Sequence, residues 1–191
     1  MRAYRALGMS KLLYIHGFSS CGVGQKSTVL SACFGEEYVD APNLPPSGND
    51  AVSLLESMVE KGEYDLLVGS SLGGFYAAYI AEKYHMKAVL INPSIKPWET
   101  LKPYVGWQKR FCDGEVFEFK AVYLEQMREF ESKPNAGTYL VLLQSKDEVL
   151  DYTKAKMHYQ NERVVVEYGG NHRFENLEDY LSMIGNFKHA Q

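Results

Sequence analysis

The sequence contains few cysteines, no long apolar run and no block of basic residues. Its cysteines, Cys21, Cys33 and Cys112, are odd in number and lack C-x-x-C spacing. This pattern predicts free thiols in a reducing compartment, not a disulfide framework or a zinc site. No apolar run reaches the roughly 18–20 residues that a membrane span needs. With a net charge of −4 and no Lys/Arg block, the sequence gives no reason to expect nucleic acid as a partner.

The N-terminus has only a weak likeness to a signal peptide. Basic residues in 1–5 precede an apolar stretch, but Lys11 interrupts it and no small-x-small cleavage site follows before His16. We therefore expect a cytoplasmic protein. Met9 has the character of a natural start, so residues 1–8 are interpreted as an extension with little structural role.

A length of 191 residues suits one domain with a full core. Short apolar runs alternate with segments of helical spacing, which predicts a mostly parallel sheet covered by helices on both faces. The strands are expected at 11–15, 38–39, 64–68, 87–91, 139–143 and 163–167. The helices are expected at 25–34, through 52–59, from the end of the third strand to about 84, at 152–159 and at about 175–187.

Residues 93–135 break this alternation. Prolines punctuate the start of the segment and aromatic residues crowd it, while 116–130 has the spacing of a helix. Because long excursions in compact domains are often functional, we interpret the segment as a small cap that lines an acyl or alcohol pocket. The alternative is an ordinary insertion whose aromatic residues pack on the body of the domain.

A Gly-x-Ser-x-Gly motif, with Ser71 between Gly69 and Gly73, follows an apolar strand and precedes an alanine-rich helix. A serine in such a strand-to-helix turn is typical of the nucleophile elbow of serine hydrolases. The turn needs small neighbours because strand and helix nearly touch there. The elbow exposes only its middle position, so Ser71 is preferred over Ser70. The alternative is a plain Gly/Ser-rich turn.

His172 and Asp147 complete a catalytic constellation at two other predicted strand ends. The chain order serine, aspartate, histidine is that of an α/β-hydrolase. His172 would accept the serine proton, and Asp147 would hold the imidazole in its productive tautomer. Asp151 and Glu148 stay open as alternatives for the acid, and a solvated loop is the alternative for His172.

The remaining histidines have weaker claims, since His85 and His158 lie late in helices and His189 lies in the tail. The backbone N–H groups of Leu72 and Phe18 are the predicted oxyanion-hole donors. Phe18 follows His16-Gly17 in the loop after the first strand. His16 is then a structural residue and not a second base.

Five segments together resemble the YqiA-like esterases, a small α/β-hydrolase family of bacteria. They are 13–20, 68–75, 90–94, 142–152 and 169–174, and the resemblance extends from about residue 10 to the end. It implies an esterase that acts on acyl esters without a cofactor, and it leaves thioesters such as acyl-CoA open as a further substrate class. It also implies that Asp147 is the acid. Lys146 stands where the family pattern has glycine, and Asn171 where it has an acidic residue.

The sequence thus predicts an α/β-hydrolase fold of about six mostly parallel strands with a small aromatic-rich cap. The predicted function is cleavage of short- to medium-chain carboxylic acyl esters through an acyl-enzyme on Ser71. The alternatives are an acyl-CoA thioesterase and a non-catalytic ligand-binding protein on the same scaffold. A dehalogenase would need a carboxylate at the elbow, where this chain has serine.

Overall fold

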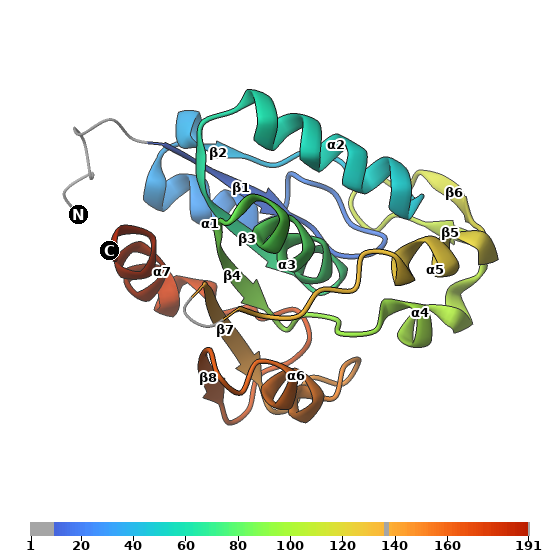
Figure 1. The fold of residues 1–191 in the computed structure, drawn as a ribbon. Coiled ribbons are helices and arrows are strands. Elements are labelled where there is room, and N and C mark those ends of the chain that lie inside the picture. Colours follow the sequence, from blue (N-terminus) through green and yellow to red (C-terminus); the bar gives the residue numbers. More distant parts are fainter. Residues whose placement is uncertain (1–9, 136–137, 191) are drawn as a thin grey trace.

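The computed structural model describes residues 10–135 and 138–190 (Figure 1). The expectation that residues 1–8 are a dispensable extension therefore lies outside the described residues. Within the described parts of the chain, no helix combines the length and the apolar character needed to cross a bilayer.

A six-stranded sheet in the order β2-β1-β3-β4-β7-β8 forms the centre of the molecule. All neighbouring strands in it pair in parallel, which confirms the predicted α/β-hydrolase architecture. The strands are β1 (Lys11–Ile15), β2 (Val39–Asp40), β3 (Tyr64–Ser70), β4 (Lys87–Ile91), β7 (Tyr139–Gln144) and β8 (Arg163–Glu167). Because all of them run in one direction, the loops that follow them gather at one edge.

Helices cover both faces of the sheet and enclose two apolar clusters (Figure 1). One face packs against α1 (Gln25–Phe34) and α7 (Leu181–His189), which contribute Leu30 and Ile184 to the core. The other face packs against α2 (Gly48–Lys61), α3 (Leu72–Tyr84) and α6 (Tyr152–His158). The strands between them are accordingly continuous apolar runs, as expected for strands buried on both sides.

Residues 93–135, called the cap below, lie beyond the sheet beside the N-terminal end of α2 (Figure 1). The cap contains α4 (Pro97–Thr100), η2 (Lys102–Tyr104), β5 (Gly106–Lys109), β6 (Val116–Phe119) and α5 (Ala121–Arg128). The expected helix over 116–130 is therefore wrong in its first part. Val116, Phe117 and Phe119 favour a strand, and antiparallel pairing with β5 decides the matter.

The last helix also begins later than expected. Residues 177–180 form the 3-10 turn η3 (Leu177–Tyr180), and the α-helix starts only at Leu181. Asn176, just before this turn, donates its side-chain amide to Glu167 and Asp179. Side chains of this type compete with helical hydrogen bonds near a chain reversal, which accounts for the delayed start.

A disulfide joins Cys21 and Cys112, which corrects the expectation of three free thiols. Of the three cysteines, Cys33 alone is free. The two partners lie 91 residues apart in the sequence, yet their Cα atoms are 6.0 Å apart. No local spacing could reveal the pair, because it connects the loop after β1 to the turn between β5 and β6.

We predict that Cys112→Ser lowers the melting temperature, whereas Cys33→Ser leaves it nearly unchanged. A crosslink across 91 residues stabilises the fold by about 4.6 kcal/mol in the chain-entropy model. For a chain of this size that corresponds to roughly 10 °C. Thermal melting of both variants, and of the native chain with and without dithiothreitol, tests this. Equal melting of reduced and oxidised native protein would contradict it.

Candidate active site

Ser71 lies in the sharp turn between β3 and α3 and has a left-handed backbone, with φ 56° and ψ −121°. This conformation is strained for a residue with a side chain and persists only where the surroundings enforce it. A Cβ at Gly69 would overlap the carbonyl oxygen of Gly73, and one at Gly73 would overlap that of Ile15. The two glycines are thus required by the close approach of helix and strands.

The elbow presents Ser71 and hides its neighbour, because Ser70 is buried at 6% exposure. The backbone of Ser71 is fixed on two sides. Its N–H donates to the carbonyl of Ile91 (3.0 Å), and its own carbonyl accepts from the N–H of Ser94 (3.0 Å). The hydroxyl is therefore held over the edge where the strand-end loops gather.

His172 and Asp147 form a continuous hydrogen-bonded chain with Ser71. Nε2 of His172 lies 3.0 Å from Oγ of Ser71, and its Nδ1 lies 2.8 Å from Oδ2 of Asp147. The Asp147 side chain is 2% exposed and that of His172 is 19% exposed. A carboxylate that accepts from Nδ1–H leaves Nε2 free to accept the serine proton, which is the arrangement of a serine-hydrolase triad.

The second oxygen of Asp147 is occupied as well. Oδ1 accepts the backbone N–H groups of Val149 and Leu150, both at 2.8 Å. The carboxylate is thus clamped to its own loop with Oδ2 directed at the imidazole.

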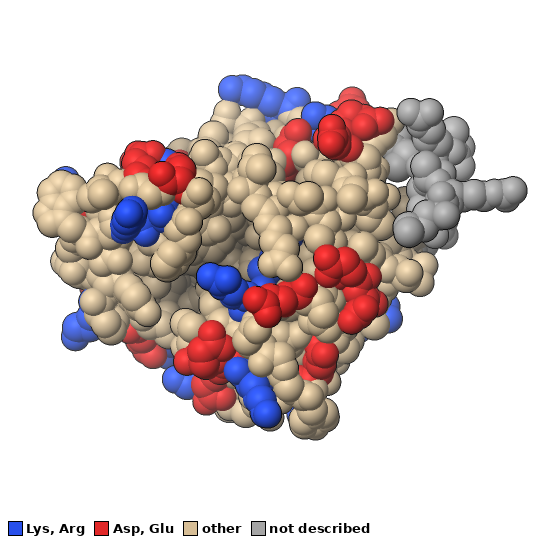
Figure 2. Space-filling model, turned by 180° about the vertical axis from the view of Figure 1, so that it is seen from behind, with Lys and Arg blue, Asp and Glu red and all other residues tan. Residues whose placement is uncertain are grey.

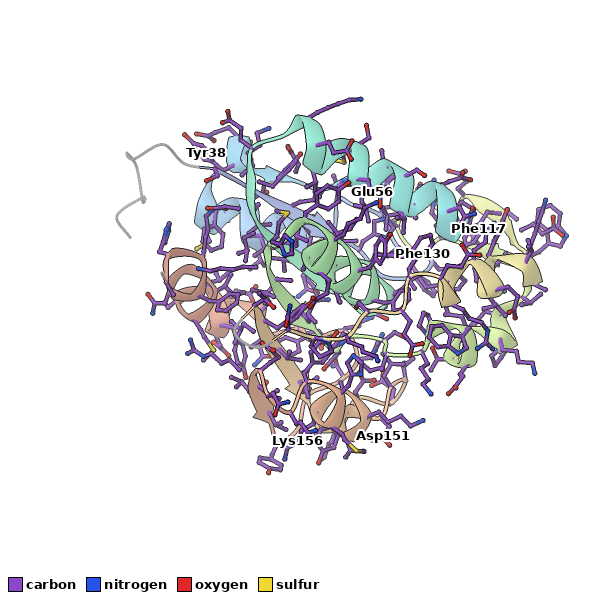
Figure 3. The ribbon with its side chains drawn as sticks, in the orientation of Figure 1. Tyr38, Glu56, Phe117, Phe130, Asp151 and Lys156 are labelled. Carbon is purple, nitrogen blue, oxygen red and sulfur yellow. A yellow bond between two sulfur atoms is a disulfide. The ribbon has the colours of Figure 1, made fainter. Side chains whose placement is uncertain are left out.

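The two alternative acids lie elsewhere. Asp151 begins α6 (Figure 3), where it caps the helix by accepting from Thr153 N–H. This hydrogen bonding, from the hydroxyl and the N–H of Thr153, lowers the pKa of Asp151. Glu148 accepts the backbone N–H of His172 at 3.0 Å and does not contact the imidazole. That bond lowers the pKa of Glu148, so Glu148 holds the loop that carries His172.

The loop after β1 lies directly against the elbow. A Cβ at Gly17 would sit 3.2 Å from Cβ and 3.7 Å from Oγ of Ser71. Within the described residues, neither the N–H of Phe18 nor that of Leu72 donates to a protein acceptor. Two free N–H groups beside the serine, one of them at a helix N-terminus, have the character of oxyanion-hole donors.

His16 is buried and bonded on both ring nitrogens. Its Nε2 accepts the N–H of Leu44 (2.9 Å), so Nδ1 carries the proton and donates to the carbonyl of Gly17 (2.8 Å). Burial lowers the pKa of His16, which favours this neutral form. The ring thus links two loops, as expected for a structural residue.

A cavity of about 190 Å³ opens onto Ser71 and His172. Its lining is mostly apolar, and the cap supplies Ser94, Thr100, Leu101, Tyr104, Gln108 and Phe111. A smaller cavity of about 70 Å³ shares Phe18 with the larger one and is lined in part by Phe117 (Figure 3) and Arg110. Figure 2 shows a hollow near the centre of the face seen there, with charged residues of both signs scattered around it.

Some aromatic residues of the cap line the cavity, and others pack on the body of the domain. Tyr104 and Phe111 line the larger cavity, whereas Trp98 and Phe119 are buried in the core. Trp107 is 73% exposed and faces solvent. The segment therefore borders the cavity and also packs on the body of the molecule.

Two departures from the family pattern lie beside the triad. The N–H of Lys146 donates to the carbonyl of Gly169 (3.0 Å), which ties the Asp147 loop to the His172 loop. Asn171 donates its side-chain amide to Glu175 (2.9 Å). Within the described residues, Oδ1 of Asn171 is buried and has no hydrogen-bond partner, so the Asn171 side chain is only partly satisfied in this loop.

The sequence analysis did not identify Asn92 and Gln144, whose side chains bond to the backbone of the His172 loop. Asn92 donates its side-chain amide to the carbonyls of Asn171 and His172, at 3.1 and 3.3 Å. Gln144 accepts the N–H of Asn171 at 2.9 Å. One sequence feature could have pointed to Asn92: it directly follows a predicted strand and precedes Pro93, so it lies at the edge of the sheet where the strand-end loops gather.

Comparison with known proteins places the chain in a family. The model of the uncharacterised protein family UPF0227 matches residues 11–189. A UPF0227 protein of Serratia proteamaculans is 27% identical over 93% of this chain and 98% of its own length. One of Yersinia pseudotuberculosis is 28% identical over 93% of this chain and 98% of its own length.

Solved structures share the fold at low sequence identity. Mouse alpha/beta hydrolase domain-containing protein 10 has a TM-score of 0.74 at 14% identity, covering 92% of this chain and 88% of its own. A monoacylglycerol lipase of Paleococcus ferrophilus has 0.71 at 17% identity, covering 98% of both chains. Est1E of Butyrivibrio proteoclasticus, solved with ferulic acid bound, has 0.69 at 15% identity, covering 96% and 90%. The motif resemblance is confirmed at the level of the family: with a matching model over nearly its whole length, the chain belongs to UPF0227, the family of the YqiA-like proteins.

Proposed function

We propose that this chain is a serine hydrolase that cleaves short- to medium-chain carboxylic acyl esters through an acyl-enzyme on Ser71. The observation that carries the proposal is the unbroken chain from Asp147 Oδ2 through His172 to Ser71 Oγ, with contacts of 2.8 and 3.0 Å. Nucleophile, base and acid are within hydrogen-bond reach before substrate binds, which is the geometry that acyl transfer needs.

In the proposed reaction, Ser71 Oγ attacks the ester carbonyl while His172 Nε2 takes the hydroxyl proton. The oxyanion accepts hydrogen bonds from the N–H groups of Phe18 and Leu72. His172 then gives its proton to the leaving alcohol as the C–O bond breaks. Water attacks the acyl-enzyme by the same route, which releases the acid and restores Ser71. Asp147 stabilises the imidazolium in both halves.

The cavity supports the substrate size. An engineered cavity of about 150 Å³ in another protein holds benzene, and the cavity at Ser71 measures about 190 Å³. This space suits a short acyl chain or one ring. Among the structural neighbours, a monoacylglycerol lipase and an enzyme solved with ferulic acid share the fold, which agrees with an ester substrate. Thioester cleavage would use the same groups and is tested alongside.

A cytoplasmic location stays a prediction. It rested on the expected free thiols and on the weak likeness of the N-terminus to a signal peptide, and the first of these two arguments no longer holds. The sequence argument used free thiols, whereas Cys21 and Cys112 are joined. Disulfides are rare in cytosolic proteins, although redox-responsive ones occur there.

We predict that a fluorophosphonate probe labels Ser71 covalently. The free Phe18 and Leu72 N–H groups and the His172 base should activate this hydroxyl alone. Peptide mass spectrometry locates the adduct, and Ser71→Ala should abolish it while Ser70→Ala should not. Labelling at another serine would refute Ser71 as the nucleophile, and no labelling in folded protein would favour the non-catalytic binding protein.

We predict that Asp147→Asn lowers kcat strongly, whereas Asp151→Asn does not. In serine proteases the corresponding change costs about 10⁴-fold in kcat, or about 5 kcal/mol of barrier. Asp151 contacts Thr153 and not His172, so its variant is the matched control. Melting curves check that both variants fold. Loss of turnover in folded Asp151→Asn would refute the assignment of the acid.

We predict that kcat/KM declines for acyl chains too long for the cavity. The test is a series of p-nitrophenyl esters and a parallel series of acyl-CoAs, from two carbons upwards. Leu101 lines this cavity. Leu101→Ala should therefore enlarge it and shift the acyl-chain length with the highest kcat/KM to longer chains. A rate that rises steadily with chain length would contradict the size argument, and faster cleavage of acyl-CoAs would identify a thioesterase.

A further inference from the structure

Asn92 is a buried polar residue in an unusual backbone conformation at the end of β4. It is 3% exposed and has a φ of 41°. Asparagine is one of the few residue types that enter the left-handed region with modest strain. A buried amide without partners would cost free energy, so such a side chain is retained only where its hydrogen bonds are made.

The Asn92 amide makes three hydrogen bonds, two to the His172 loop and one to the end of β7. Its Nδ2 donates to the carbonyls of Asn171 (3.1 Å) and His172 (3.3 Å). Its Oδ1 accepts the backbone N–H of Gln144 at 2.9 Å. Two carbonyls can only accept and an N–H can only donate, so the chemistry of the partners fixes the orientation of the amide.

The backbone of the histidine loop is held on its N–H side as well. Asn171 N–H donates to Oε1 of Gln144 (2.9 Å), and His172 N–H donates to Oε2 of Glu148 (3.0 Å). With the two Asn92 bonds, the N–H and C=O groups of both residues are occupied. The position of the imidazole therefore follows from these anchors and not from its own contacts alone.

The same segment also holds the nucleophile. Ser71 N–H donates to the carbonyl of Ile91, and Ser94 N–H donates to the carbonyl of Ser71, each at 3.0 Å. Asn92 thus lies in a four-residue stretch that is bonded to the Ser71 backbone on one side and to the His172 backbone on the other. No other side chain among the described residues donates to the His172 carbonyl.

We propose that Asn92 is a positioning residue that sets the separation of His172 Nε2 and Ser71 Oγ. The inference rests on the proposed function, because it assigns a catalytic consequence to that separation. Asn92 is not among the residues that line the cavities, so its loss should change kcat and leave KM nearly unchanged. A displacement of about 1 Å in such a constellation lowers the rate about 100-fold.

Asn92→Asp is the sharpest variant, because it changes one amide nitrogen to oxygen. Burial favours the neutral form of a carboxyl group here, whereas the N–H of Gln144 that Oδ1 accepts favours the ionised form, so both forms of the variant have to be compared. While protonated it can still donate one hydrogen bond to a loop carbonyl; once ionised it repels both carbonyls. We expect kcat of the variant to fall as pH rises through the pKa of this carboxyl group, to about 100-fold below the native value. The native protein, which has an amide at this position, is the reference over the same pH range.

Asn92→Gly keeps the left-handed backbone at no steric cost and removes all three hydrogen bonds, so it serves if the aspartate variant does not fold. Val89→Ala is the control. Val89 is fully buried in the same strand, so its truncation lowers stability without touching the loop. A positioning role predicts low kcat with native KM for Asn92→Gly and native kcat for Val89→Ala.

A readout independent of turnover separates the two proposals. The proton on Nδ1 of His172, bonded to Asp147 at 2.8 Å, should give a low-field NMR signal that His172→Ala removes. We expect that signal in the native and Val89→Ala proteins, and its loss in Asn92→Gly. A native kcat and an unchanged signal in Asn92→Gly would overturn the inference. If the native protein cleaves no ester but the signal still depends on Asn92, the proposed function fails and the positioning role stands.

Discussion

The close approach of β3 and α3 at Ser71 is the constraint on which the site depends. Gly69 has no room for a Cβ against α3, and Gly73 has none against the end of β1. At this turn the chain holds a serine, and not a glycine, at a φ of 56°, which is a strained conformation for a residue with a Cβ. That strain has to be held by its surroundings, and the Ile91 and Ser94 bonds to the Ser71 backbone do so. Ser71 is thus placed by packing at the elbow and by the segment that follows the neighbouring strand β4.

Much of the site could be predicted because its signals are local. Ser71 is marked by glycines two positions away on either side, and His172 by the glycines before it. The parallel sheet then brings separate strand ends to one edge, so three local signals become one prediction. The structure brings Ser71, Asp147 and His172 into hydrogen-bonding contact. Asp147 could be separated from Asp151 by the same logic, since a residue before a helix is more often its cap.

What could not be predicted depends on contacts distant in the sequence. The strand Val116–Phe119 has a sequence that also fits a helix, and only its pairing with β5 decides between them. The Cys21–Cys112 link closes a separation of 91 residues that no spacing rule covers. The three bonds of Asn92 reach residues in β7 and in the loop after β8. A single asparagine after a strand carries no sign of partners that far along the chain.

The disulfide and the Asn92 hydrogen bonds, which sequence patterns did not reveal, both lie in the segments around the candidate site. The disulfide ties the loop of Phe18 to the cap, and Phe111 N–H donates to the Ser19 carbonyl (2.9 Å) beside it. Asn92 ties the elbow to the histidine loop. The first set of contacts fixes the wall of the cavity relative to the backbone of Phe18, and the second fixes His172 relative to Ser71. Reactive groups supplied by local motifs become an organised site only through such long-range contacts, because catalysis is sensitive to about an ångström of placement. Stability of the sheet alone would not require either set, since the core clusters lie on the two faces of the sheet and are formed by other residues.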